Sequence, residues 1–397
     1  MRIGIDAHIL GKGRGGVERV VLQMVRQVPD LLPGHSFIIF TNRSYRPPFP
    51  DRPNVRYVSL LLSDPVIQRS LLLPWLVRKW RLDLLHVQRI APPFPGCRLV
   101  VSIHDILPLT DRSSHPGWRD ELVRRLTPGS VRRADRIVTV SGTVRDELAA
   151  RFPESAGRVT AIYNGIDPEF YRGDDGAGDG ASRERDRPPY LLCMGAIAPR
   201  KNLEVVLRAF RIFLKGPRRA RLVLAGLIRS RAYQERLDRL VAELDLTGSV
   251  TFTGFISDED YRSLLQGARL FLAPSRGEGF DLPALEAGAS GRAVICSDIP
   301  VHRELLGNGA VFFPPDDAET LARHIEDLWE QEEERKRLGQ AARQRAADFS
   351  WERMAGQLAA LYVEVGKASL SRAGNEILYP PGIPSASVES PRIQRLV

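Results

Sequence analysis

Short runs of apolar residues alternate with amphipathic segments along the first 170 residues or so. A short continuous apolar run is typical of a strand buried on both faces, and apolar residues three and four apart are typical of a helix. The pattern predicts helices over 18–28 and 143–151. It predicts strands over 2–7, 36–41, 82–87, 99–103, 136–141 and 159–162. Strands interleaved with helices predict a parallel, doubly wound α/β sheet.

A polar segment at 173–187 interrupts this pattern and contains no large apolar residue, which is typical of a linker or an exposed loop. The alternation then restarts, with strands predicted over 190–194, 221–225, 250–253, 270–273 and 293–296. The helices predicted between and beside them cover 203–214, 230–244, 261–265 and 283–289. We therefore expect two α/β domains, 1–172 and 190–350, joined by a linker at 173–189.

Helix-forming sequence also fills 318–338 and 351–365. The segment 366–397 contains several prolines and little apolar periodicity, which predicts a disordered tail.

Composition narrows the class of protein. Among 397 residues only three are cysteines, which excludes a disulfide scaffold and an all-cysteine zinc site. The net charge of +9 favours anionic partners such as nucleotides, phosphates or an acidic membrane surface.

Aromatic residues are spread along the chain and no nucleic-acid-binding module is visible, so we expect no nucleic-acid partner. No stretch approaches the ~20 apolar residues that span a bilayer, and Asp6 interrupts the N-terminal apolar run, so we expect a cytoplasmic protein.

A glycine-rich segment, GKGRGG at 11–16, follows the first predicted strand and formally matches the dinucleotide-binding pattern G-x-G-x-x-G. Three residues separate it from the strand, and the second strand ends without the carboxylate that would hold a ribose, which disfavours a nicotinamide cofactor. Closely spaced glycines before a helix still suit an anion. Phosphate contact by Gly15 and Gly16 and a flexible turn both remain open here.

Two adjacent cations, Arg200 and Lys201, follow the strand 190–194 and precede a helix. Ligands of open α/β sheets bind outside the carboxyl ends of the strands. A guanidinium group can bind two oxygens of a diphosphate, and an ammonium group adds a point charge. The pair is also typical of a solvated surface, so position alone leaves both interpretations open.

The segment APSRGEGFDLPALEA at 273–287 is the most informative. Glycines bracket Glu278, and Pro283 begins a helix that contains Glu286. The backbone N–H groups at the start of this helix form an anion site; they belong to Gly279, Phe280, Asp281 and Leu282. Two glutamates would repel a phosphate if both faced it, so we expect each to bind hydroxyl groups on either side of it, one set on a sugar and one on a ribose. A helix dipole attracting acids would explain one glutamate but not the Gly–Glu–Gly bracket.

At this point the chain resembles the retaining glycosyltransferases of family 4, which have the GT-B fold of two Rossmann-like domains facing each other across a cleft. The resemblance rests on RKN at 200–202 and EGFDLPALE at 278–286. Supporting stretches are GRGGVERVV (13–21), SIHDILPLT (102–110), RADRIVTVS (133–141), VTAIYNGID (159–167) and VTFTGFISDEDY (250–261). The resemblance covers about residues 1–365 and is more specific for fold and reaction class than for the sugar.

The resemblance implies that the first domain binds the acceptor and the second domain the nucleotide sugar. The helix 351–365 would cross back onto the first domain. Arg200 and Lys201 would neutralise the donor diphosphate, Glu278 would lie near the sugar hydroxyls, and Glu286 would bind the ribose.

In the first domain, the resemblance implies that Gly15 and Gly16 contact phosphate or sugar through the backbone. It also implies that His104 contacts the transferred sugar, and Asp105 beside it could orient its ring. Asn164 and Gly165 end a strand at the cleft, where we expect them to form a turn. Asn202 departs from the glycine that is frequent at its position in the family.

The expected reaction is retaining transfer from a nucleotide-diphosphate sugar, with charge on the leaving diphosphate stabilised by the two cations and the helix N-terminus. We expect no cofactor and no metal, because these groups already balance the diphosphate. The acidic run 258–260 is interpreted as a helix start rather than a metal site.

The stretches SIHDILPLT and APRKN look most like bacterial surface-polysaccharide mannosyltransferases, which favours GDP-mannose, with UDP-glucose or another hexose donor open. The acceptor would be a free or lipid-linked glycan. The arginine-rich stretch 119–136 suits an anionic membrane and a plain solvated face equally. A non-catalytic nucleotide-sugar-binding homologue would be expected to lack Glu278 or the Arg200–Lys201 pair.

Overall fold

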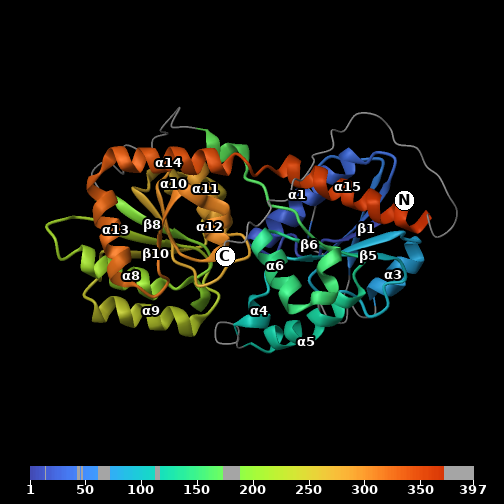
Figure 1. The fold of residues 1–397 in the computed structure, drawn as a ribbon, viewed down its shortest axis with the longest axis horizontal. Coiled ribbons are helices and arrows are strands. Elements are labelled where there is room, and N and C mark those ends of the chain that lie inside the picture. Colours follow the sequence, from blue (N-terminus) through green and yellow to red (C-terminus); the bar gives the residue numbers. More distant parts are fainter. Residues whose placement is uncertain are drawn as a thin grey trace, which may run out of the picture.

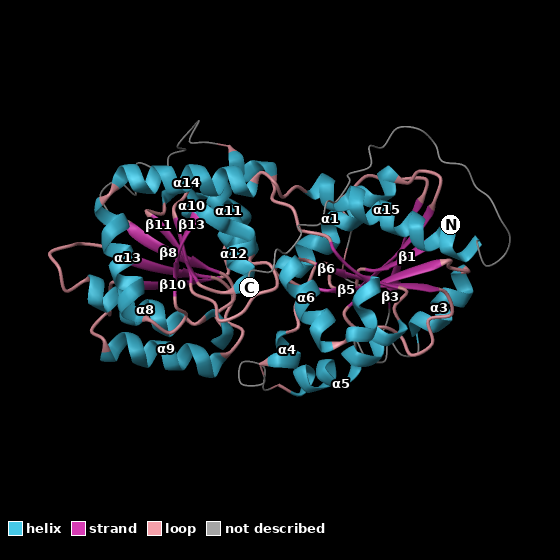
Figure 2. Ribbon diagram, in the orientation of Figure 1, coloured by secondary structure: helices cyan, strands magenta, loops and turns pink. Residues whose placement is uncertain are grey.

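The computed structural model describes residues 1–13, 15–42, 45, 48–60, 72–111, 117–172 and 188–370. These residues form two lobes side by side, each built on a parallel sheet covered by helices (Figure 1, Figure 2). Most of the expected linker, 173–187, and of the expected disordered tail, 371–397, lies outside the described residues. The start of that tail was predicted wrongly, because residues 366–370 continue the last helix.

The sheet of the first lobe is parallel throughout and has the strand order β3-β2-β1-β4-β5-β6-β7. Its strands are β1 (Arg2–Asp6), β2 (Ser36–Asn42), β3 (Val55–Leu60), β4 (Leu84–Gln88), β5 (Arg98–Ile103), β6 (Arg136–Thr139) and β7 (Val159–Ala161). The helices are α1 (Gly16–Leu31), α3 (Leu73–Trp80), α4 (Leu107–Thr110), α5 (Trp118–Arg133) and α6 (Gly142–Arg151), with 3-10 turns η2 (Pro153–Arg158) and η3 (Pro168–Tyr171). The strand order reverses between β1 and β4, which makes that edge a ligand-binding position in a doubly wound sheet.

The sheet of the second lobe is also parallel and has the order β10-β9-β8-β11-β12-β13. Its strands are β8 (Tyr190–Met194), β9 (Arg221–Ala225), β10 (Val250–Gly254), β11 (Leu270–Ala273), β12 (Val294–Ser297) and β13 (Ala310–Phe313). Its helices are α8 (Leu203–Phe213), α9 (Arg231–Glu243), α10 (Asp258–Gly267), α11 (Leu282–Ala289), α12 (Pro300–Leu306), α13 (Ala318–Glu330) and α14 (Glu332–Ala346), with 3-10 turns η4 (Pro199–Lys201) and η5 (Gly307–Gly309). Here the order reverses between β8 and β11.

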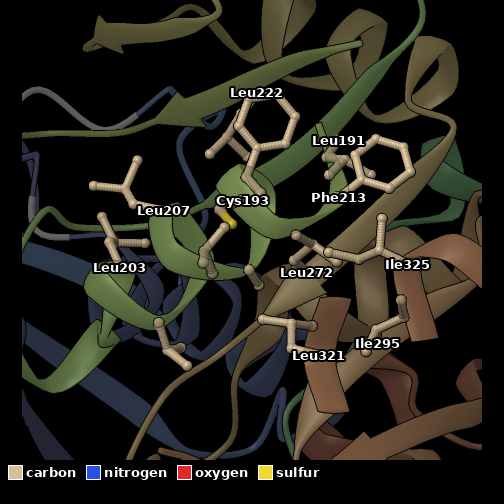
Figure 3. Close-up of a cluster of buried hydrophobic side chains, with 14 of the residues drawn as sticks. Leu191, Cys193, Leu203, Leu207, Phe213, Leu222, Leu272, Ile295, Leu321 and Ile325 are labelled. Atoms are coloured by element: carbon tan, nitrogen blue, oxygen red, sulfur yellow. The ribbon is translucent and has the colours of Figure 1, made fainter. Parts of the chain in front are cut away.

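Both faces of each sheet are buried, which explains why the strands are continuous apolar runs rather than alternating ones. In β2, Phe37 and Ile39 join the core cluster under α1, while Ile38 and Phe40 join the cluster under α3 on the opposite face. In the second lobe, the cluster of Figure 3 joins β8, β9, β11 and β12 to α8 and α13, through side chains such as Leu222, Phe213 and Leu321. Each sheet is thereby fixed, and its carboxyl edge is available for ligands.

The last described helix, α15 (Trp351–Leu370), lies along the first lobe, although it follows the second lobe in the chain (Figure 1). Trp351, Met354, Leu358 and Tyr362 are buried in the cluster that also contains Ile3 of β1. A helix from the far end of the chain therefore completes the core of the first lobe.

Several elements differ from the expectations. The strands β3 and β13 and the helices α3, α4 and α12 were not predicted, because each is short and lies beside proline-, glycine- or polar-rich sequence. The longer helix α5 was not predicted because it contains Pro128 and lacks a clear apolar face. The helix-forming stretch 318–338 belongs to two helices, since Gln331 has φ −88° and ψ 87° and ends α13 before α14 begins. None of the described helices is long and apolar enough to cross a membrane.

Candidate functional site

The basic pair and the glutamate loop lie at the carboxyl edge of the second sheet, where the strand order reverses. Arg200 and Lys201 follow β8, and Glu278 follows β11, the neighbouring strand. The backbone N–H of Arg276 donates to the carbonyl of Arg200 at 2.9 Å, which ties the two loops together. This is the position at which open α/β sheets bind ligands.

The two cations and Glu278 form one buried cluster. Arg200 donates to Glu278 Oε1, and Lys201 Nζ lies 2.8 Å from the same oxygen. The hydroxyl of Ser275 donates to it at 2.9 Å. Burial opposes ionisation of Glu278, but the charges of Arg200 and Lys201 outweigh it and hold the pKa of the carboxyl below its usual value. Contacts with Glu278 therefore hold the side chains of Arg200 and Lys201 in position.

The side chain of Asp281 extends this cluster, which the sequence analysis did not expect because it assigned Asp281 a role only through its backbone. Asp281 Oδ1 lies 3.2 Å from Lys201 Nζ, and Oδ2 lies 3.0 Å from His302 Nε2. Asp281 has φ 59°, a left-handed conformation that is unfavourable for a residue with a side chain. The carboxylate is thus held in place at the cost of backbone strain.

His302, on α12, is geometrically an imidazolium. Its Nδ1 lies 2.9 Å from the carbonyl oxygen of Ser297 and its Nε2 faces the carboxylate of Asp281. A carbonyl and an ionised carboxylate only accept, so both ring nitrogens must donate. Burial disfavours this charge, but the hydrogen bond to Asp281 raises the pKa of His302 to about 10. Arg200, Lys201 and His302 face Glu278 and Asp281, so the cluster carries one net positive charge.

Glu286 lies on α11 and forms a separate centre with two residues that the sequence analysis missed. Arg19 of α1 donates to Glu286 Oε1, and the hydroxyl of Tyr261 donates to Oε2. Glu286 is almost completely buried. Because Glu278 contacts Arg200 and Lys201 while Glu286 contacts Arg19 and Tyr261, the two glutamates have different partners, as expected if they bind different parts of a ligand.

The two lobes meet directly at the glutamate loop. A Cβ atom on Gly279 would overlap the carbonyl oxygen of His104, so only glycine allows this approach. The hydroxyl of Ser141 donates to the carbonyl of Gly279 at 2.8 Å. A Cβ atom on Gly16 would lie 3.3 Å from Leu282 Cδ1, whereas one on Gly15 would meet no atom within 4 Å. The structure therefore brings the glycine loop of the first lobe to the N-terminus of α11, with open space beside Gly15.

A second polar contact between the lobes was not foreseen. Glu304 of α12 accepts from the backbone N–H groups of Gly142 and Thr143 at 2.6 and 2.7 Å, and from the hydroxyl of Tyr163 at 2.7 Å. A carboxylate at the N-terminus of α6 is favoured by the free N–H groups and the helix dipole. The same two lobes are thus joined again by the residues that directly follow Ser141.

His104 lies at the carboxyl end of β5 and is buried next to a small cavity. The cavity measures about 20 Å³, enough for a single water molecule, and its lining includes His86, Gln88, His104 and Asn164. His104 Nε2 lies 2.8 Å from Gln88 Oε1. Burial and the charge of Arg89 lower the pKa of His104 to about 4, so the ring is neutral near pH 7.

Two expectations near His104 are wrong. Asp105 does not orient His104: its carboxylate pairs with Arg89 at 2.7 Å, and Gln88 is the partner of the histidine. Asn164 and Gly165 do not form the expected turn: neither residue belongs to a turn, and the φ of Gly165 is not positive. A Cβ atom there would overlap the backbone N of Trp351, so this glycine allows the start of α15 to approach.

The acidic run 258–260 begins α10, as expected. Ser257 Oγ accepts from the backbone N–H of Asp260 at 3.0 Å. Within the described residues, His, Cys, Asp and Glu side chains do not gather in any group of three or more that could hold a metal ion.

Comparison with known families fits this geometry. The family model "Glycosyl transferases group 1" matches residues 179–345, and "Glycosyltransferase Family 4" matches residues 14–170. The chain belongs to the group 1 and family 4 glycosyltransferases. Together the two matches cover both lobes of this glycosyltransferase.

Curated relatives of this glycosyltransferase include two O-antigen enzymes. The O-antigen chain mannosyltransferase RfbU of Salmonella typhimurium is 28% identical over 228 residues, which are 57% of this chain and 60% of that protein. The O-antigen chain mannosyltransferase B of Escherichia coli is 28% identical over 287 residues, 70% of this chain and 73% of that protein. The match to the Salmonella protein thus spans less than two thirds of its length.

Solved structures share the fold of this glycosyltransferase. The sucrose-phosphate synthase of Thermosynechococcus elongatus superposes with a TM-score of 0.76 at 23% identity, covering 93% of this chain and 100% of that one. Anabaena Alr3699/HepE, solved in complex with UDP and glucose, gives a TM-score of 0.71 at 18% identity, covering 92% of this chain and 100% of that one. The expected GT-B fold is confirmed.

We predict that His302→Gln changes how stability depends on pH. The folded pKa of about 10 lies above the unfolded value of 6.5, so the stabilisation is complete below pH 6.5 and is lost as pH rises through 10. Between these values the free energy of unfolding of the wild type should fall more steeply than that of the variant, by up to about 1.4 kcal/mol per pH unit for one proton. Urea denaturation at pH 6.5, 8 and 9.5 measures the free energy of unfolding of both proteins. If this free energy changes equally with pH in the two proteins, His302 is not protonated in the folded state.

Proposed function

We propose that the chain is a retaining glycosyltransferase that transfers mannose from GDP-mannose to a glycan or a lipid-linked glycan acceptor. The observation that carries the proposal is the cluster of Arg200, Lys201 and Glu278 at the reversal point of the second sheet, beside the N-terminus of α11 and opposite the first lobe. The two O-antigen mannosyltransferases support mannose as the sugar and surface-polysaccharide assembly as the setting.

In the proposed reaction, the bond between the sugar C1 and the diphosphate oxygen breaks and the acceptor oxygen bonds to C1 on the same face. The proton of the acceptor hydroxyl passes to the departing phosphate oxygen, so no separate base is needed. Arg200 and Lys201 stabilise the charge on that oxygen together with the backbone N–H groups at Phe280, Asp281 and Leu282. The net positive charge of the cluster matches a ligand whose negative charge grows as the bond breaks.

The remaining contacts would position the donor and the acceptor. Glu278 binds hydroxyls of the sugar and Glu286 those of the ribose. Gly15 and Gly16 approach the donor from the first lobe, where Gly15 has open space around it. His104 contacts the transferred sugar as a neutral imidazole, which can accept or donate a hydrogen bond. The reaction would need no metal ion, because cations and a helix terminus already face the diphosphate.

The alternative donor is UDP-glucose or another hexose nucleotide, which the solved complex of HepE with UDP and glucose favours. A non-catalytic homologue that only binds a nucleotide sugar is the second alternative.

A ligand panel tests the donor. Thermal unfolding with GDP, UDP and ADP, and with their sugars, should show the largest stabilisation for GDP and GDP-mannose, about 2.7 kcal/mol at a ligand concentration of 100 Kd. Release of GDP from GDP-mannose in the presence of acceptor should proceed fully in excess EDTA. A preference for UDP-glucose would replace mannose with glucose, binding without turnover would favour the non-catalytic alternative, and complete loss of activity in EDTA would contradict metal independence.

Glu278→Gln should separate turnover from nucleotide binding. Because the carboxylate pairs with both cations, its removal should leave GDP binding as tight as before or tighter, while turnover falls on the order of 10²–10³-fold. Steady-state kinetics and calorimetric titration with GDP measure the two effects. The exposed Glu259 on α10 provides a matched control, Glu259→Gln, that should change neither. Turnover near that of the wild type in Glu278→Gln would defeat the assignment.

We also propose that the first lobe contacts an anionic membrane at the inner face of the cell through α5. Trp118 at its start is 69% exposed, and the side chain of Arg125 is 76% exposed. Basic and aromatic side chains together suit the headgroup region of such a surface. Flotation should recover the wild-type protein with anionic vesicles but not with neutral ones. The double variant Trp118→Ala/Arg125→Gln should be recovered with anionic vesicles in a smaller amount. Recovery with neither lipid would favour a plain solvated face, and equal recovery with both would contradict an electrostatic contact.

A further inference from the structure

Arg19 is a side chain of the first lobe that contacts a buried carboxylate of the second lobe. It lies one turn into α1, directly after the glycine loop, and donates to Glu286 Oε1 on α11. Its guanidinium also lies 6.0 Å from the ring centroid of Tyr261, which holds the other carboxylate oxygen. The side chain of Arg19 remains 27% exposed, whereas that of Glu286 is 2% exposed.

Glu286 needs a nearby cation to favour its ionised form, in which both carboxylate oxygens only accept hydrogen bonds. Burial raises the pKa of its carboxyl above the usual value, and the nearby carboxylate of Asp167 raises it further. Arg19 and Tyr261 act in the opposite direction. Asp167 lies 4.0 Å from Arg19 Nε, and Asp258 is the other acid that acts on Arg19. Among these neighbours, Arg19 supplies the positive charge that favours ionised Glu286.

The Glu286 carboxylate has hydrogen-bonding capacity beyond its two donors. Each carboxylate oxygen can accept more than one hydrogen bond, and Arg19 and Tyr261 occupy one direction on each. An ionised carboxylate with two fixed donors has a fixed plane, so its remaining lone pairs point in set directions. Two adjacent hydroxyl groups of a ribose are ligands that such a carboxylate binds well.

We propose that Arg19 is a positioning residue for nucleoside recognition: it holds the Glu286 carboxylate, across the boundary between the lobes, in the orientation that accepts the ribose hydroxyls. The inference rests on the proposed function, which assigns the ribose to Glu286. The first lobe thus takes part in choosing the donor as well as in binding the acceptor.

The test compares GDP with 2′,3′-dideoxy-GDP, which differ only in the ribose hydroxyls. The wild type should bind GDP at least about tenfold more tightly, since hydrogen bonds to a charged group are among the stronger ones. Arg19→Met and Arg19→Gln should reduce this ratio to near one at pH 7, and Arg19→Lys should restore part of it. Arg26→Met, which removes an exposed charge from the same helix, should leave the ratio unchanged.

The pH dependence provides a readout that a merely structural role would not produce. In Arg19→Met the loss of the nearby positive charge should raise the pKa of Glu286 further, so the preference for GDP should be weaker at pH 7 than at pH 9. In the wild type the preference should already be present at pH 7. Calorimetric titration of each nucleotide at both pH values measures this preference. Equal melting temperatures of Arg19→Met and Arg26→Met would show that folding is intact. If Arg19→Met unfolds, the same comparison is made with Arg19→Gln.

The outcomes separate the two proposals. A wild type that binds none of GDP, UDP and ADP overturns the proposed function and this inference with it. A wild type that prefers GDP over its dideoxy analogue, with the same preference in Arg19→Met and Arg19→Gln, overturns the inference alone.

Discussion

The ammonium group of Lys201 lies between two buried carboxylates, and the organisation of the proposed donor site depends on this interaction. A buried charge is tolerated only when it is paired, and here Glu278 and Asp281 provide the partners. The carboxylate of Asp281 also pairs with His302 on α12. The loops after β8 and β11 and the helix α12 are therefore held as one unit. Because the groups are already paired and oriented, little reorganisation is needed when charge develops on a ligand.

The same unit stores strain. Asp281 adopts a left-handed backbone conformation that costs on the order of 1–3 kcal/mol for a residue other than glycine. This conformation places its carboxylate against Lys201 and His302 while ending the loop at the first turn of α11. The free energy of the ionic network offsets the strain, which links the stability of the second lobe to the geometry of its site.

Contacts between the lobes include apolar packing, such as Val140 and Phe170 in the core cluster of the second lobe, and polar contacts that depend on close backbone approach. Gly279 meets the carbonyl of His104, Glu304 binds the N-terminus of α6, and Arg19 binds Glu286. These contacts join three separate elements of each lobe, so the groups proposed to bind donor and acceptor share one fixed frame. Loss of any one contact would alter the relative position of groups on the two sheets.

Much of this could be predicted from the sequence, because the relevant signals are local. The GEG bracket, the proline at the helix start and the basic pair after β8 each lie within a few residues, and the structure brings them together. Arg19 and Glu286 are 267 positions apart, and no local pattern indicates that they meet. The side-chain role of Asp281 was missed for a related reason, since its partner His302 lies on the following helix and gives no signal as a lone histidine.

The position of α15 has a consequence for biosynthesis. Trp351 and Tyr362 fill the interior beneath β1, which is made from the first residues of the chain. During translation the N-terminal lobe therefore remains without part of its core until the entire C-terminal lobe has left the ribosome. The lobe synthesised last can therefore complete its core first, while apolar surface beneath β1 stays uncovered until α15 is made.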